Sequence, residues 1–290
     1  MNGYWLAFVL GIIEGVTEFL PVSSTAHLRI AQALLGINLD DEYWKMFAIV
    51  IQLGAILSVV VYFWKRLRDC TTSFQEELSA CTRALFNHPL VLTLVAFVVT
   101  AVPSYLLSRV IGENLESLFV IASALVLGGA VMWGVDVMCA QPKIFRLEEM
   151  RVTHALWIGL VQILSAVFPG TSRSMSTIAG GQVIGLSRAA ALEFSFFVSI
   201  PTMFAATGYD LLKTLFGSHG RGTASDTVAG TVTMGLHEWV MLGIGFATSF
   251  LVAWAVIAWF MNWVRARGFV PFAIYRLLVG AVILLWTFSS

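Results

Sequence analysis

The chain has 290 residues, of which 58% are hydrophobic and only 12% are charged. Soluble domains carry about 25% charged residues, so this composition excludes a protein whose surface lies mostly in water and predicts one membrane domain, residues 1–290. The formal net charge is zero, which argues against a nucleic-acid partner.

The first apolar stretch, residues 4–19, is too short to cross a bilayer as a helix. At roughly 1.5 Å per residue it extends about 24 Å, whereas the hydrocarbon core is about 30 Å thick. It stops before Pro21, and a stretch of the same length, residues 153–168, stops before Pro169. Each is followed by a Ser/Thr cluster and a second short helical stretch, at residues 25–36 and 174–186.

Six longer apolar stretches can each span the membrane, since a spanning helix needs roughly 20 apolar residues. They lie at about 46–64, 89–109, 117–138, 191–214, 236–263 and 271–288. Non-helical backbone at membrane depth is tolerated where protein or a cavity surrounds it. We therefore predict an all-α polytopic protein with six transmembrane helices and two re-entrant segments, each a helix, a polar turn near the midplane and a helix back to the same side. The alternative is two full spans, each kinked at its proline.

Lysine and arginine set the expected orientation. If the two re-entrant segments do not cross, the basic residues after the first, third and fifth spans share one side, which the positive-inside rule makes cytoplasmic. These residues are Lys65, Arg66, Arg68 and Arg83; Lys143, Arg146 and Arg151; and Arg265 and Arg267. This parity agrees with re-entrance but does not exclude two additional crossings.

Residues 11–25 and 159–173 share a pattern at a constant offset of 148. The matched pairs are Gly11 and Gly159, Glu14 and Gln162, Pro21 and Pro169, Ser23 and Thr171, Ser24 and Ser172, and Thr25 and Arg173. Three predicted spans separate the copies, and an odd number of crossings inverts the second one. We predict an inverted-topology repeat of about 1–140 and 150–290, with the site where the two broken helices meet near the midplane.

Glu14 and Glu18 are four residues apart, so they share one face of the first short helix. Two carboxylates in a membrane segment are energetically expensive and need partners. They can hold a divalent cation through oxygen ligands, or one of them can act as a general base. The alternative is a pair that lines a polar cavity without chemistry.

Residues 21–25, PVSST, have the composition of a helix start. The free N–H groups and the positive dipole end of such a start bind phosphate. Ser24 and His27 are three residues apart and can share a face, a spacing that suits activation of the hydroxyl or proton donation by the imidazole. Helix capping alone would explain Ser23 and Thr25, but it does not explain His27.

Residues 169–174, PGTSRS, build the opposing helix start. A guanidinium near the membrane centre needs an anion, and the fork of Arg173 matches phosphate oxygens. The alternative is a structural ion pair with Glu14 or Glu18. The hydroxyls predicted to extend this phosphate-binding surface are those of Thr171, Ser172, Ser174 and Thr177.

Other polar residues give weaker signals. Packing between helices explains some of them as well as substrate contact does, namely Gln52, Glu193, Ser195 and Arg276. The remaining histidines are predicted to be solvated at span ends or in loops: His88, His154, His219 and His237. The cysteines lack metal-ligand spacing and are predicted to be reduced thiols: Cys70, Cys81 and Cys139.

The segments EGVTEFLPVSSTAH (14–27) and PGTSRSMST (169–177) closely resemble the two signature segments of the undecaprenyl-diphosphate phosphatase family, the bacitracin-resistance type. The resemblance extends to EFSFFVSIP (193–201) and FAIYR (272–276), so it covers nearly the whole chain. Ala26 stands where the family commonly has glycine, a small departure that leaves the expected activity undisturbed.

This resemblance implies a multi-pass enzyme of the bacterial inner membrane that removes the terminal phosphate from the C55 isoprenoid diphosphate. The product would be the lipid carrier for peptidoglycan precursors, and abundance of the enzyme would confer bacitracin resistance. The resemblance also implies a divalent cation, Mg²⁺ or Ca²⁺, and an active site reached from the periplasmic side. The family's essential residues fall on Glu14, Glu18, Ser24, His27 and Arg173, with Ser23, Thr25, Ser172 and Thr177 in support.

These residues favour metal-assisted phosphoryl transfer. Glu14 and Glu18 would hold the cation, and Arg173 would neutralise charge on the transferring phosphoryl group. Ser24 is the candidate nucleophile, with Glu18 or His27 moving the proton, while direct attack by water activated by Glu18 stays open. A transporter of lipid phosphates is the rival hypothesis, since inverted repeats with broken helices are transporter architecture. The isoprenoid length and any homodimer also stay open.

Overall fold

The computed structural model describes residues 3–38, 41–80, 83–108, 117–216 and 235–289. Within these residues the chain forms eleven α-helices, two short 3₁₀-helices and no β-strand. The α-helices are α1 (Gly3–Thr17), α2 (Ser24–Leu34), α3 (Glu42–Tyr62), α4 (Trp64–Ser79), α5 (Pro89–Ser108), α6 (Leu118–Met138), α7 (Val152–Val167), α8 (Arg173–Val183), α9 (Arg188–Phe216), α10 (Leu236–Arg267) and α11 (Val270–Ser289). The 3₁₀-helices are η1 (Arg83–Asn87) and η3 (Leu147–Glu149).

Within the described ranges, six helices are long and apolar enough to cross a membrane: α3, α5, α6, α9, α10 and α11. They confirm the all-helical prediction and the six apolar spans. Their apolar surface continues to the outside of the bundle. On α11, Leu278, Val282 and Leu285 are 62%, 65% and 71% exposed, a stripe that suits hydrocarbon rather than water.

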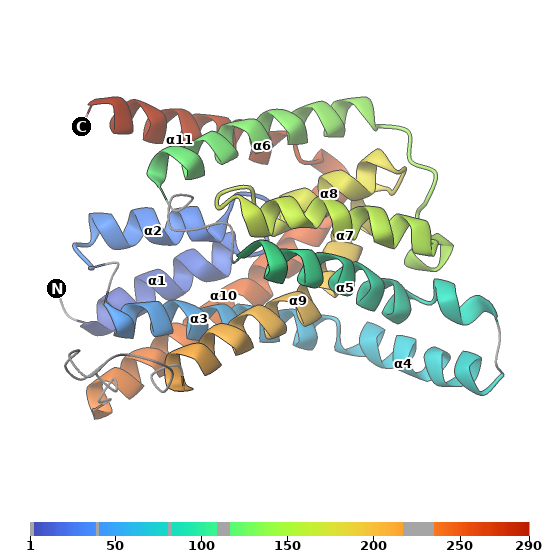
Figure 1. Cartoon of the computed structure of the whole chain (residues 1–290), viewed down its shortest axis with the longest axis horizontal. Coiled ribbons are helices and arrows are strands. Elements are labelled where there is room, and N and C mark those ends of the chain that lie inside the picture. The colour runs from blue at the N-terminus through green and yellow to red at the C-terminus, as the bar shows by residue number, and fades with distance from the viewer. Residues whose placement is uncertain (1–2, 39–40, 81–82, 109–116, 217–234, 290) are drawn as a thin grey trace.

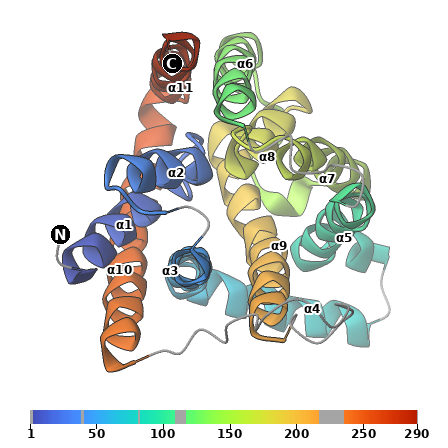
Figure 2. The same cartoon turned by 60° about the vertical axis from the view of Figure 1, so that its left-hand side comes forward.

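The long helices lie roughly side by side along the long axis of the molecule (Figure 1). At one edge α6 packs against α11, and in the body of the bundle α10 packs against both α1 and α3 (Figures 1 and 2). α7 packs against α5, and α3 against α9. Each short helix, α1 or α7, is thus held by a long neighbour of apolar composition.

Glycines bring the two short helices close to these neighbours. A Cβ on Gly11 would lie 2.7 Å from the carbonyl oxygen of Gly245 in α10, and a Cβ on Gly159 would lie 2.7 Å from that of Ala96 in α5. Small residues allow such close backbone approach between membrane helices, where van der Waals packing drives association. Both short helices are therefore fixed by the same kind of contact.

Helix α4 is an element that the sequence prediction missed, because its charged composition resembles a loop. It continues α3 after Phe63, and it buries Cys70 against the core. Arg66 pairs with Glu148 at 2.5 Å and with Glu193 at 3.0 Å, which ties α4 to η3 and α9. Glu193 therefore takes part in an ion-pair network between helices.

Asp136 joins several helix ends through a fully buried carboxylate. It accepts hydrogen bonds from Arg188 at 2.7 Å, from the Gln182 side chain at 3.0 Å and from the backbone N–H of Phe269 at 2.9 Å. A buried carboxylate is tolerated when donors satisfy it in this way. The contact fixes the end of α8 relative to α6 and α11.

The prediction that His88 is solvated is wrong. His88 is only 4% exposed and precedes α5, where its Nδ1 accepts from the backbone N–H of Leu90 at 3.2 Å. The proton then lies on Nε2, 3.0 Å from the Ser73 hydroxyl, and burial lowers the pKa of His88. His237 is exposed and His154 is partly exposed, whereas His219 lies outside the described residues.

The close contact at Gly11 predicts a cost for added volume. Gly11→Ala should lower the free energy of unfolding by about 1–3 kcal/mol, because the methyl group overlaps the α10 backbone. The matched control is Gly243→Ala in α10, where an added Cβ meets nothing within 4 Å. Thermal unfolding in detergent measures both, and equal melting temperatures for the two variants would contradict this packing.

Candidate active site

Two turns meet inside the bundle. One comprises residues 18–23 between α1 and α2, and the other comprises residues 168–172 between α7 and α8. The Ser174 hydroxyl, at the start of α8, donates to the carbonyl of Leu20 in the first turn at 3.0 Å. Two segments about 150 residues apart in sequence therefore form one site.

Glu18 is the centre of this site. Its Oε2 accepts a hydrogen bond from the Ser24 hydroxyl at 2.5 Å, and its Oε1 lies 3.3 Å from Nη2 of Arg173. The side chains of Glu18 and Arg173 are only 5% and 13% exposed. The structure thus brings together one predicted acid, the predicted nucleophile and the predicted arginine.

Ser24 and Arg173 occupy matching places, since they are the first residues of α2 and α8. The residue before each of them has positive φ, 74° at Ser23 and 72° at Ser172. These are the only non-glycine residues with positive φ in the described part of the chain, and such conformations concentrate at functional sites. The two serines are 149 positions apart, so the constant offset of 148 fails here because one more residue lies between Pro169 and Ser172 than between Pro21 and Ser23.

The two helix starts present free backbone donors. Ser23 makes no side-chain cap at α2, whereas the Ser172 hydroxyl accepts from the N–H of Met175 at 3.4 Å. The first N–H groups of any helix lack partners inside the helix. Together with the positive end of the helix dipole, they form a surface suited to phosphate.

A cavity of about 520 Å³ opens onto these groups. Its polar lining residues are Glu18, Ser23, Ser24, Thr25, Gln52, Thr100, Gln162, Ser165, Ser172, Arg173 and Thr202. Sequence reasoning assigned no role to Thr100, Ser165 or Thr202, since isolated hydroxyls in apolar helices usually bond their own backbone. Of the predicted residues, Glu14, His27, Thr171, Ser174 and Thr177 do not line the cavity.

Thr177 and Ser174 contact residues that border Arg173. Thr177 donates to or accepts from Ser195 at 2.6 Å, and the Ser195 carbonyl accepts from Nη1 of Arg173 at 3.3 Å. Ser174 also contacts the Ser172 hydroxyl at 3.0 Å. Ser195, a weak signal in the sequence, thus helps to orient Arg173.

His27 is not paired with Ser24. Its Nδ1 lies 2.7 Å from the carbonyl of Ser23, and its Nε2 lies 2.7 Å from the hydroxyl of Tyr275 in α11. A carbonyl can only accept, so Nδ1 is protonated and its N–H donates a hydrogen bond to the Ser23 carbonyl. In this arrangement the partner of the Ser24 hydroxyl is Glu18.

Glu14 is 1% exposed, and neither of its carboxyl oxygens has a hydrogen-bond partner among the described residues. It interacts electrostatically with Glu18, one helical turn away. Orphaned carboxyl oxygens beside a second acid suit a divalent cation, which takes oxygen ligands. No group of three or more His, Cys, Asp or Glu side chains gathers within the described ranges, so other ligands would have to come from hydroxyls, backbone or phosphate.

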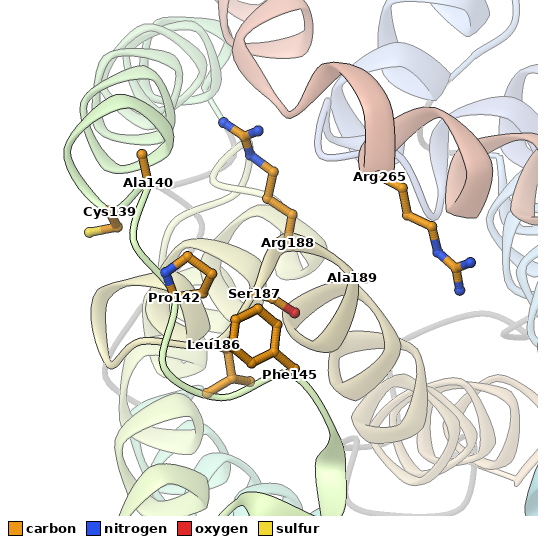
Figure 3. A pocket seen from close by; sticks show the side chains of 9 residues that line it. All are labelled: Cys139, Ala140, Pro142, Phe145, Leu186, Ser187, Arg188, Ala189 and Arg265. Atoms are coloured by element: carbon orange, nitrogen blue, oxygen red, sulfur yellow. The ribbon is translucent and has the colours of Figure 1, made fainter.

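A second cavity, of about 450 Å³, lies where the end of α6, the α8–α9 turn and the end of α10 come together (Figure 3). Arg188 and Arg265 line it and point in different directions (Figure 3). The guanidinium of Arg188 is already bound to Asp136. None of the predicted site residues lines this cavity, so the cavity beside Glu18 is the candidate active site.

Six helices of membrane-crossing length, with an acid, an arginine and hydroxyls in an interior cavity, define an integral membrane protein with a polar interior site. The profile of the family described as bacitracin resistance protein BacA matches residues 7–282. The chain belongs to that family.

Relatives named undecaprenyl-diphosphatase cover almost the whole chain. The one from Koribacter versatilis is 58% identical over 99% of both chains. The one from Caldanaerobacter subterraneus is 40% identical over 96% of this chain and 94% of its own, and the one from Polaromonas naphthalenivorans is 39% identical over 98% and 95%. The predicted family resemblance is confirmed.

The positive φ of Ser172 predicts an order of stability among variants. Ser172→Ala should lower the free energy of unfolding by about 0.5–2 kcal/mol through loss of the cap, and Ser172→Gly should lower it less, because glycine adopts positive φ freely. The corresponding Ser117 variants are the control, since Ser117 caps α6 at φ −65°. Thermal unfolding should show a larger advantage of glycine over alanine at Ser172 than at Ser117, and the reverse would contradict the strain.

Proposed function

We propose that this chain hydrolyses undecaprenyl diphosphate to undecaprenyl phosphate and inorganic phosphate. The observation that carries the proposal is the contact of Glu18 with both Ser24 and Arg173 at two helix starts inside a membrane protein. The names of the relatives supply the substrate. Recycling of the carrier lipid for peptidoglycan synthesis and resistance to bacitracin follow from that activity.

Re-entrance of both hairpins and inversion of the repeat belong to the proposal. In Figure 1 the α1–α2 hairpin opens toward one end of the bundle and the α7–α8 hairpin toward the other. The packing partners correspond as well, since α1 packs on α10 as α7 packs on α5, and α3 packs on α9. Inverted repeats place a site near the bilayer midplane, between the halves.

The proposed orientation puts the basic segments in the cytoplasm of a bacterial inner membrane. Lys65, Arg66 and Arg68 lie on α4, and Arg265 and Arg267 lie at the end of α10. The α1–α2 hairpin would then open toward the periplasm, which is the side from which the substrate diphosphate would enter.

In the proposed reaction, the Ser24 Oγ attacks the terminal phosphorus. Its proton passes to Oε2 of Glu18, which already accepts the Ser24 hydrogen bond, and the bond from that phosphorus to the bridging oxygen breaks. Isoprenoid monophosphate leaves, and water then cleaves the phosphoserine. Of the two candidates for moving the proton, the distances favour Glu18, and His27 holds the turn through Ser23. Water activated by Glu18 is the alternative nucleophile.

Arg173 and the free N–H groups at the starts of α2 and α8 bind the phosphoryl oxygens and stabilise the charge that develops on them. A diphosphate brings several negative charges into a site where Glu18 already pairs with Arg173. We therefore include a divalent cation, Mg²⁺ or Ca²⁺, held by Glu14 and Glu18. When bound, it would supply charge neutralisation for the transferring group.

Loss of Arg173 should abolish most of the activity. Arg173→Ala should reduce kcat/KM for phosphate release from farnesyl diphosphate by about 10²–10³ or more, because a buried charge-stabilising donor is lost. Arg173→Lys keeps the positive charge but lacks the planar guanidinium fork, so its kcat/KM should lie between those of wild type and Arg173→Ala. Arg267→Ala, which removes an arginine stacked on Trp263 at the end of α10, is the matched control. Near-normal release by Arg173→Ala would exclude this arrangement.

Removal of divalent cations should stop phosphate release by the wild-type protein in detergent, and Mg²⁺ or Ca²⁺ should restore it. Glu14→Gln should require a higher cation concentration for half-maximal activity, because one oxygen ligand becomes neutral. Full activity in excess chelator would contradict the requirement for a divalent cation. Turnover in detergent, without any gradient, also excludes a pure carrier.

A further inference from the structure

Arg276, in α11, is a fully buried guanidinium whose hydrogen-bond partners among the described residues are backbone carbonyls. Its Nη1 donates to Pro21 at 3.0 Å, and its Nη2 lies 3.0–3.1 Å from the carbonyls of Ala124, Gly170 and Thr171. It has no ion-pair partner in the part of the chain that the structure describes. One side chain thus links the α1–α2 turn, the α7–α8 turn and α6.

These contacts fix the direction of backbone donors. In a trans peptide, the C=O of one residue and the N–H of the next point in opposite directions. Because the Thr171 carbonyl points to Arg276, the Ser172 N–H points away from it. That N–H has no hydrogen-bond partner among the described residues, and Ser172 lines the cavity beside Glu18.

α6 is shaped to leave room for this guanidinium. A Cβ built on Gly128 would overlap Nη2 of Arg276, whereas a Cβ on Gly134 in the same helix meets nothing within 4 Å. Gly128 therefore gives a way to displace Arg276 without changing it. Gly134 gives a matched control.

We propose that Arg276 is a positioning residue for phosphoryl transfer, an inference that rests on the proposed function. It holds the carbonyls of the two turns on the side away from the substrate, so that the N–H of Ser172 and the helix starts face the phosphate. Lysine carries the same charge but presents its donors from a single point, so it cannot reach both turns as the planar fork does.

The test compares wild type, Arg276→Lys, Gly128→Ala and Gly134→Ala, purified in detergent with farnesyl diphosphate and Mg²⁺. Removing one preorganised hydrogen-bond donor costs about 10²–10³ in kcat, so misalignment of the Ser172 N–H should lower kcat at least ~10-fold. We expect that loss in Arg276→Lys and Gly128→Ala, with KM within about threefold of wild type and with cooperative thermal unfolding retained. Gly134→Ala should keep the wild-type kcat.

A second measurement separates positioning from loss of folded protein. Orthovanadate mimics the transferring phosphoryl group, so its inhibition constant should rise in step with the fall in kcat when the donors are misaligned. If the variants merely reduced the folded fraction, the inhibition constant would match wild type and the inference would be overturned. The inference would also be overturned if kcat of Gly128→Ala stayed within about twofold of wild type. This result would count even if Arg276→Lys did not fold. Absence of hydrolysis by the wild type would instead refute the proposed function.

Discussion

The burial of charged side chains in an apolar interior is the constraint on which the structure depends. Four ionisable side chains, Glu14, Glu18, Arg173 and Arg276, lie inside an apolar helical bundle, where an unpaired charge costs several kcal/mol. Glu18 and Arg173 form an ion pair, and the two terminal nitrogens of Arg276 donate to carbonyl groups. Glu14 alone has no partner among the described residues. Glu14 is therefore a buried acid without a nearby cation in the described part of the chain, and in the proposed function an arriving diphosphate would add further negative charge.

The two buried arginines differ in the groups that accept their hydrogen bonds. Arg173 faces a carboxylate and a cavity, so its guanidinium can exchange Glu18 for phosphate oxygens without entering a worse environment. Arg276 donates to four carbonyls, in the two turns and in α6, and does not line the cavity. In the proposed function the first arginine binds substrate, while the second holds the backbone of the two turns. Asp136 performs the same holding task with opposite charge at the ends of α6 and α8.

Hydropathy, segment length and the cost of burying charge were enough to predict six spans, two short helices and a meeting of Glu18 with Arg173. These criteria failed where the hydrogen-bond partner of a side chain is remote in sequence or is a backbone group. His27 bonds Tyr275, 248 positions away, and the acceptors of Arg276 are carbonyls that no sequence pattern marks. Helix α4 was missed because its charges are paired with residues on other elements. The burial of His88 was missed because the Ser73 hydroxyl that accepts its hydrogen bond lies on that same helix.

The halves of the chain resemble each other, yet the site requires them to differ. Ser24 and Arg173 are the first residues of α2 and α8, and both reach the same carboxylate of Glu18. Identical halves would place either two serines or two arginines there. Two serines would leave the phosphate without a cation in the protein, and two arginines would leave no hydroxyl to attack. Glu14 and Gln162 also differ, since a carboxylate at position 162 in α7 would be a third buried carboxylate and would repel the anion. In the proposed reaction, one hairpin therefore supplies the nucleophile and its base, and the other supplies the positive charge.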